Sequence, residues 1–180
     1  MINKNSVVYK RIKQRHYEMM LAKDIVAGDI LCGFDITERK YVEVKVTSCI
    51  KIQNTCYRLK MTNQDHFFVS PDTFLLTTNG FWCTKDLADY GAFKLVKKDL
   101  SVQGANTYTP AIDTKILEAP DFFYDIRTAT EHPILVDGYL IYFKSSETNK
   151  YGFQKESNSD QPITESLDAQ QRTIRVPEEI

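Results

Sequence analysis

The chain has 180 residues, of which 42% are hydrophobic and 26% charged, and this composition is typical of one folded domain with tails rather than of a disordered chain. Its 23 basic and 24 acidic residues give a formal net charge of −1, which excludes a generally basic nucleic-acid binder. No apolar run approaches the ~18 residues of a membrane span, and the first residues lack the apolar stretch of a secretory signal peptide.

The charge is distributed unevenly even though it sums to nearly zero. Residues 1–20 carry five basic side chains and one acidic, a net charge of +4, while residues 154–180 carry three basic and six acidic ones, a net charge of −3. We interpret residues 1–20 as a basic N-terminal arm or first strand, and residues 145–180 as an extended polar C-terminal arm. Both are either solvated chain ends or arms that dock on neighbouring subunits of opposite charge.

Residues 21–144 are typical of a β-domain. Apolar and polar residues alternate over 42–52 and 57–61, the pattern of half-buried strands. Further strands are predicted by the apolar runs at 67–69, 74–77, 81–82, 122–126, 134–136 and 139–143. Turns between them are predicted at Ser70-Pro71-Asp72, Asn79-Gly80 and Asp137-Gly138. The sequence therefore predicts an all-β fold, with residues 84–90 as its one short helix.

The cysteines and histidines show no metal-binding or redox motif. None of the four cysteines forms a CxxC pair, so we expect reduced thiols that pack as small apolar residues. The three histidines are scattered along the chain. We expect no metal and no other cofactor. A cysteine hydrolase that uses Cys83 and His132 is disfavoured, because Cys83 follows a hairpin strand instead of opening a helix, where a thiolate is stabilised.

Three segments, in this order and at this spacing, resemble the Hint family, the module shared by hedgehog autoprocessing domains and inteins. They are residues 21–31, with Gly28-Asp29; residues 57–87, with Ser70-Pro71-Asp72-Thr73 and Gly80-Phe81-Trp82; and residues 123–141, with Tyr124-Asp125 and Glu131-His132-Pro133. The resemblance covers residues 6–144. It implies a compact all-β horseshoe with pseudo-twofold symmetry, in which Gly28 allows positive φ and Asp29 hydrogen-bonds its own turn.

The activity that this resemblance implies is an N-to-S or N-to-O acyl shift. The family requires Cys or Ser at the first position of the module, because that nucleophile attacks the carbonyl that precedes it. A Thr-x-x-His motif polarises the scissile bond, and a second His lies near the end of the module. In inteins a His-Asn pair closes the module, and cyclisation of the Asn releases the chain.

The first half of the sequence departs from this pattern. Counted from the Gly28-Asp29 turn, the nucleophile falls at residues 4–7, where only Ser6 is available. The Thr-x-x-His motif aligns with residues 70–73, so that Ser70 takes the place of the Thr and Thr73 that of the His. An alternative register through His66 is disfavoured, because it misplaces the strand that follows.

The second half keeps part of the pattern. Asp125 and His132 match the late motif, and we interpret His132 as a structural histidine whose hydrogen bonds are satisfied. The closing His-Asn pair falls on Tyr142-Phe143, which cannot cyclise. Ser70, Thr73, Asp125 and His132 are therefore interpreted as vestigial positions, since Thr73 carries no group that titrates near neutral pH.

Loss of the nucleophile, the polarising His and the terminal Asn removes all three steps, so we predict a Hint-like domain without autocatalysis. We expect it to serve as a structural or interaction module that binds other protein subunits of a larger assembly through its two arms. A virion part, such as a phage tail or baseplate component, is one hypothesis, with a location in the cytoplasm or the virion and no membrane partner. The alternatives are a remnant self-processing domain that uses Ser6 or His66, and a free-standing binding domain.

Five aromatic residues lie close together just before the polar C-terminal segment: Tyr139, Tyr142, Phe143, Tyr151 and Phe153. Aromatic side chains beside a polar arm are typical of a protein–protein interface, so we predict that these residues form one. The alternative is that they close one end of the β-domain.

Overall fold

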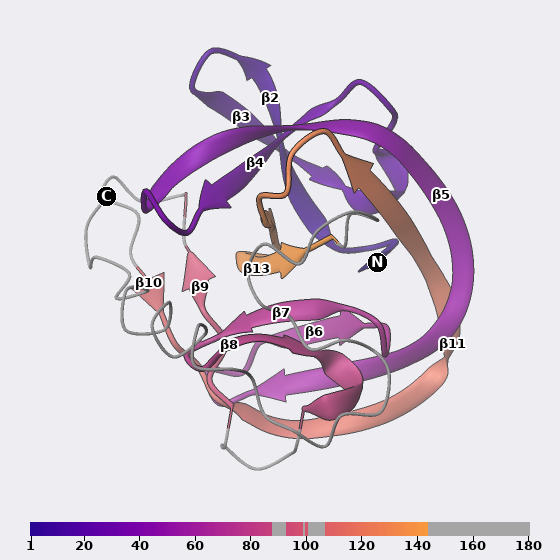
Figure 1. Ribbon diagram of the computed structural model, residues 1–180. Helices are drawn as coiled ribbons and strands as arrows, with labels where there is room; N and C mark the ends of the chain where they lie inside the picture. The colour runs from indigo at the N-terminus through magenta and orange to yellow at the C-terminus, as the bar shows by residue number, and fades with distance from the viewer. Residues whose placement is uncertain (88–92, 99, 101–106, 144–180) are drawn as a thin grey trace.

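The structure is a computed structural model and describes residues 1–87, 93–98, 100 and 107–143. These residues form strands and two single-turn 3₁₀ helices, so the all-β fold class predicted from the sequence is confirmed (Figure 1). In chain order the elements are β1 (Ile2–Asn3), β2 (Val7–Lys13), β3 (His16–Leu21), η1 (Ala22–Asp24), β4 (Ile30–Asp35), β5 (Lys40–Met61), β6 (His66–Val69), β7 (Phe74–Thr77), β8 (Gly80–Cys83), η2 (Thr84–Asp86), β9 (Lys97–Lys98), β10 (Thr107–Tyr108), β11 (Ile112–Thr128), β12 (Ile134–Val136) and β13 (Tyr139–Tyr142).

Two long antiparallel strands form the outer frame of the molecule. β5 has 22 residues and β11 has 17, and they pair from Ile112–Met61 to Thr128–Val46 with three register shifts. Figure 1 shows both strands curving together around one side of the interior. The two separate strands predicted at 42–52 and 57–61 are thus one continuous strand. The polar residues between them contain neither Gly nor Pro, and their partners on β11 keep them extended.

The short central strands are buried on both of their faces. Along β13, Tyr139 and Ile141 belong to one buried apolar cluster, while Leu140 and Tyr142 belong to another. β7 alternates in the same way, with Leu75 in the first cluster and its two neighbours in the second. Strands buried on both faces consist of continuous apolar runs, which is why the segments 74–77 and 134–136 were predictable with their correct bounds.

The interface predicted from aromatic residues is wrong for the three that the structure describes. Tyr139, Tyr142 and Phe143 are only 2%, 2% and 5% exposed. The reason is that β13 is an inner strand, paired with β12, β7 and β9. Their rings therefore pack in the core and close the interior. Tyr151 and Phe153 lie outside the described residues, so their part of the prediction is untested.

Both turns expected from glycine-containing pairs exist, but one is shifted. Asp137 and Gly138 have φ of +53° and +84°, as a two-residue type I′ turn requires. In the β7–β8 hairpin, Thr77 pairs with Gly80, so Gly80, with φ of +95°, is the first residue of the second strand. The resemblance also gave the right turn before β4: Gly28 has φ of +97°, and the Asp29 carboxylate accepts a hydrogen bond from the Val26 amide at 3.0 Å.

The N-terminal residues are part of the sheet. β1 pairs with β11, and β2 pairs with β3, β4 and β12, so the interpretation of residues 1–20 as strand describes them and the interpretation as a free arm does not. The helix expected over 84–90 is reduced to η2, since residues 88–90 lie outside the described part of the chain. The predicted C-terminal arm, residues 145–180, lies there too. In the described ranges no helix has the length and apolar character to cross a membrane.

Gly33 in β4 has no room for a side chain, and this gives a first prediction. A Cβ added at Gly33 would lie 2.4 Å from Cγ2 of Val44 and 2.8 Å from the carbonyl oxygen of Pro133. We expect Gly33→Ala to lower the free energy of unfolding by about 1–3 kcal/mol, through overpacking. Urea unfolding measures this loss. In a Val44→Ala background the loss should be smaller; an equal loss in both backgrounds would show that the Val44 contact is not its cause.

Candidate functional site

A chain of buried hydroxyl groups connects the turn between β6 and β7 to the first residue. The Thr73 hydroxyl donates to the Met1 carbonyl oxygen at 2.9 Å, and its oxygen accepts the Ser70 amide at 3.2 Å. The hydroxyl oxygens of Ser70 and Thr73 are 2.9 Å apart. Because the single Thr73 proton is committed to Met1, Ser70 is the donor in this contact. Ser70 and Thr73, the two positions aligned with Thr-x-x-His, therefore act as one unit on Met1.

The end of β8 and the start of η2 hold this turn from the other side. The Thr84 amide and hydroxyl both donate to the Thr73 carbonyl oxygen, at 2.8 and 2.9 Å. The Cys83 thiol donates to the carbonyl oxygen of Pro71 at 3.0 Å. Ser70, Thr73 and Thr84 have no exposed surface. The Ser70–Thr73 turn is thus fixed by paired polar groups, as buried polar groups require.

A cavity of about 230 Å³ lies beside Met1. It brings together the residues that the resemblance assigns to the beginning and to the end of the module, although they are far apart in sequence. Its lining residues are Met1, Ile52, Asp72, Phe74, Asp125, Arg127, Tyr142 and Phe143. Thus Asp125 and the Tyr142-Phe143 pair, which takes the closing His-Asn position, meet at the cavity next to the Ser70–Thr73 turn, as the alignment implies.

Charge in this cavity comes from Asp72, Asp125 and Arg127. Arg127 donates to the Asp125 carboxylate at 3.1 Å. The α-amino group of Met1 is buried, and the loss of hydration lowers its pKa to about 6, although the nearby carboxylates of Asp125 and Asp72 oppose the shift. The cavity therefore favours a neutral group at this nitrogen.

β1 has only two residues, so its pairing alone holds the first residues weakly. Three further contacts keep them in place. The Asn3 amide donates to the Asp121 carboxylate at 3.0 Å, and the Lys4 ammonium lies 2.7 Å from the same carboxylate. The Lys4 amide donates to the Phe122 carbonyl oxygen. All three attach the segment to β11, and Thr73 holds its beginning from the opposite side.

The residues proposed as a surviving nucleophile or base lie elsewhere. Ser6 is buried, and its hydroxyl hydrogen-bonds the Asp137 carboxylate at the β12–β13 turn. His66 is exposed at the start of β6, opposite Lys60. Neither lines the cavity beside Met1. Residues 4–7, where the resemblance places the nucleophile, do not line this cavity, whereas Met1 does.

The count from the Gly28-Asp29 turn passes through a hairpin before it reaches the first residues. The β2–β3 hairpin lies between the two, with Arg15 at its tip in the left-handed region, φ of +60°. A better signal was the apolar Ile2 before the polar Asn3-Lys4-Asn5, since Ile2 pairs with β11 opposite Tyr124 and so fixes where the chain passes the cavity. Asp72 and Arg127 are the other lining residues that sequence reasoning missed.

His132 and Cys83 do not have the properties expected of them. The buried Nδ1 of His132 has no hydrogen-bond partner, so the interpretation of His132 as a fully satisfied structural histidine is wrong. His132 does not line the cavity beside Met1. Burial raises the pKa of the Cys83 thiol to about 11, which argues against a reactive thiolate there. Among the described residues, no group of three or more His, Cys, Asp or Glu side chains could hold a metal ion.

Comparison with solved structures identifies the fold, whereas no family model and no curated protein matches the sequence. The DnaB intein from Synechocystis sp. PCC 6803 superposes with a TM-score of 0.67 at 12% identity, over 80% of this chain and 98% of that one. The DnaX mini intein from Spirulina platensis gives 0.60 at 10% identity, over 78% and 97%. The gp41-1 intein gives 0.58 at 13%, over 77% and 94%. The chain has the Hint fold of the mini-inteins.

The link between Thr73 and Met1 gives a second prediction. Thr73→Val removes one hydroxyl and leaves the Ser70 amide, the Ser70 hydroxyl and the Met1 carbonyl without their partner. We expect it to lower the free energy of unfolding by about 1–3 kcal/mol. Thr73→Ser keeps the hydroxyl and is the matched control. A loss in urea unfolding that is no larger for Thr73→Val, which keeps the methyl group, than for Thr73→Ser, which keeps only the hydroxyl, would show that the hydrogen bonds are not the main contribution.

A third prediction concerns pH in a chain whose Met1 amine is free. Its pKa is about 6 in the folded state and 8.0 when solvated, so the unfolded state binds more protons between these values. Stability should therefore rise with pH by about 2 kcal/mol from pH 6 to pH 8. Urea unfolding across this range measures the rise. Acetylation of the amine should remove this component; an unchanged pH dependence after acetylation would contradict the assignment.

Proposed function

We propose that this chain is a Hint-fold domain that holds its first residues in the position for cleavage without cleaving, and that it acts as a structural or interaction module. The observation that carries the proposal is the place of Met1. It lies against the Ser70–Thr73 turn and the cavity of Asp125 and Tyr142, and we infer that it takes the place of the nucleophile that the family requires.

The Met1 side chain cannot carry out an N-to-S shift. In that step a thiol loses its proton, forms an acyl–sulfur bond and leaves a free amine in place of the amide. A thioether has no proton to lose, and an acyl group on its sulfur would give a sulfonium ion. The Met1 sulfur instead accepts a long contact from the Asn54 amide at 3.8 Å.

Thr73 also makes a contact that supports holding rather than cleaving. Its hydroxyl donates to the carbonyl oxygen of Met1 itself, whereas a nucleophile at this residue attacks the carbonyl that precedes it. The hydroxyl has no pKa near neutrality and offers no proton to a leaving amine. At the other end of the module, Tyr142 and Phe143 lack the side-chain amide nitrogen that cyclisation needs.

One observation favours the alternative of residual self-processing. The unpartnered, buried Nδ1 of His132 is unusual for a structural histidine, and His132 occupies the late-motif position of the resemblance. A buried nitrogen without a partner is a common feature of functional sites. This alternative requires a nucleophile other than Met1, and Ser6 and His66 are the candidates already named.

Fusion proteins separate the two functions and give a fourth prediction. A stable reporter domain is joined directly before Met1 and a second one after Ile180, and intact mass is followed for several days with and without hydroxylamine. We expect one constant mass, because no step can begin. A time-dependent fragment that Ser6→Ala, His66→Ala or His132→Ala abolishes would overturn the proposal.

A gain-of-function variant of the same fusion serves as the positive control. Met1→Cys with Thr73→His supplies a thiol at the first position and a titratable ring beside it. We expect this chain, with hydroxylamine or a thiol, to release the upstream reporter. Release by the unsubstituted fusion at a similar rate would show that Met1 is not the block. The assembly in which the domain acts, a virion in the sequence-based hypothesis, stays a prediction.

A further inference from the structure

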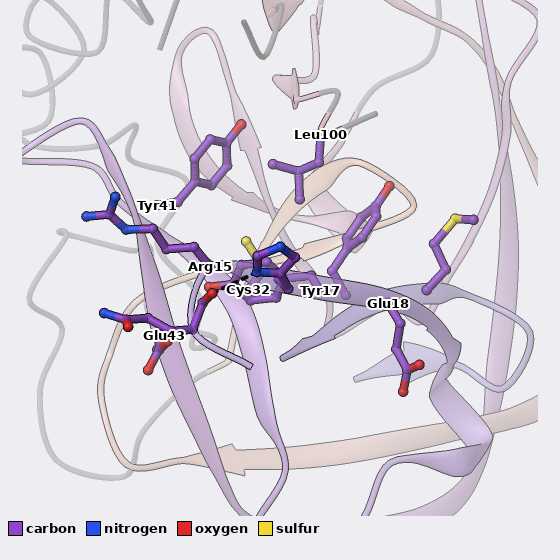
Figure 2. A pocket seen from close by; sticks show the side chains of 11 residues that line it. Arg15, Tyr17, Glu18, Cys32, Tyr41, Glu43 and Leu100 are labelled. Carbon is purple, nitrogen blue, oxygen red and sulfur yellow. Dashed lines mark hydrogen bonds between the residues drawn. The ribbon is translucent and has the colours of Figure 1, made fainter. Parts of the chain in front are cut away.

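A second, larger cavity lies on another part of the molecule and shares no residue with the cavity beside Met1. This groove has a volume of about 950 Å³ and is lined by Tyr9, Gln14, Arg15, His16, Tyr17, Glu18, Met19, Cys32, Tyr41, Glu43 and Leu100. Its volume is in the range of ligand-binding clefts. Figure 2 shows Tyr17, Tyr41 and Leu100 arranged around one space, with the Cys32 thiol between them.

The floor of the groove is a row of paired residues across four strands. Met19 of β3 pairs with Tyr9 of β2, and Cys32 of β4 pairs with Glu43 of β5. The pairing of Lys10 with Leu31 places Tyr9 beside Cys32, which completes the row. Cys32 has no exposed surface, and burial raises its pKa to about 12, so the floor is apolar.

One side of the groove is an open strand edge. Within the described residues β3 pairs only with β2, so its outer backbone groups face away from the sheet. Met19 on this strand is 73% exposed. An unpaired edge beside an apolar groove accepts an extended peptide, whose backbone continues the sheet while alternate side chains enter the groove.

The charge near the groove is positive at the hairpin tip. Glu43 is paired with Arg11 at 2.6 Å, and Lys10 is paired with Asp29 at 2.8 Å. Lys13 and Arg15 at the tip have no carboxylate partner among the described residues. The groove therefore presents apolar rings and the Glu18 carboxylate, with two cations at the hairpin tip. An occupant with aromatic side chains in the groove, followed by acidic ones at the tip, would match it.

The chain itself contains a segment with this pattern. Tyr151 and Phe153 are two residues apart, so in an extended segment both side chains point to the same side, with Gly152 between them. Residues 154–180 follow, with a net charge of −3, and Glu156 and Asp160 are the first two acids. The residues between Phe143 and Tyr151 span up to roughly 25 Å when extended.

We propose that the groove on β2–β5 binds the chain's own C-terminal segment, with Tyr151 and Phe153 in the groove beside β3 and the acids beyond them against Lys13 and Arg15. Each buried aromatic ring removes a large apolar area from water. The ion pairs at the tip are exposed, so they orient the segment and weaken with salt. The proposal does not rest on the absence of cleavage.

Hydrogen exchange on the full chain tests this. We compare the unsubstituted chain with Tyr151→Ser/Phe153→Ser, following peptides from β3 and from residues 144–160. Both peptides should exchange roughly tenfold faster in the double variant, because the C-terminal segment no longer pairs with the edge of β3. Tyr108→Ser removes an exposed aromatic ring from β10 and is the control that should change neither.

A charge swap identifies the binding site. Lys13→Glu/Arg15→Glu should speed exchange of residues 144–160, and adding Glu156→Lys/Asp160→Lys should restore part of the protection. Equal exchange in the unsubstituted chain and the Ser variant overturns the proposal. Exchange of residues 144–160 that is unchanged by Lys13→Glu/Arg15→Glu overturns it too. Protection that rises with protein concentration would place the segment in the groove of a second copy, and it too would overturn the proposal.

Discussion

The pairing of β5 with β11 is the constraint on which the rest of the structure depends. The two strands stay paired over most of their length, and the short strands are enclosed by their curve. Among the described strands β11 is the only partner of β1, and it carries Asp125 and Arg127 into the cavity beside Met1. Without this ladder the first residues would have no strand to join, because two residues cannot form a stable strand alone.

The groups around Met1 attach the first residues of the chain to the fold. Thr73 holds Met1 through a buried hydroxyl, and Asn3 and Lys4 hold the next residues to Asp121. The same network that would position a scissile bond thus stabilises the beginning of the chain inside the fold. A site of this kind contributes stability through satisfied hydrogen bonds, and in the proposed function its lack of reactivity would follow from residue types rather than from a changed backbone.

The fold was predictable from the sequence because local patterns agreed with it. Continuous apolar runs gave β7 and β12 with their bounds, and Asp137-Gly138 gave a hairpin turn. The same runs indicate that Tyr139 and Tyr142 lie in the core, since a strand without polar alternation is buried on both faces. Aromatic clustering alone does not distinguish a core from an interface.

The candidate site was only partly predictable, because it is built from long-range pairing. Ser70, Thr73 and Asp125 were found from short motifs whose spacing is fixed by tight turns. The place of Met1 beside the cavity was missed, since it depends on the pairing of β1 with β11, which are more than 100 residues apart in sequence. His132 and its unpartnered Nδ1 could not be anticipated either, because hydrogen-bond satisfaction depends on neighbours that no local pattern specifies.

The position of Met1 is the central claim, and methyl NMR of the four methionines tests it most directly. In a chain labelled with ¹³C at the methionine methyl groups, Met1 should show ring-current shifts and cross-peaks to Phe74 or Phe143, which line its cavity. Met19, which is 73% exposed, should give a sharp signal near the solvated value. A Met1 signal at that same solvated position, without cross-peaks, would contradict the account.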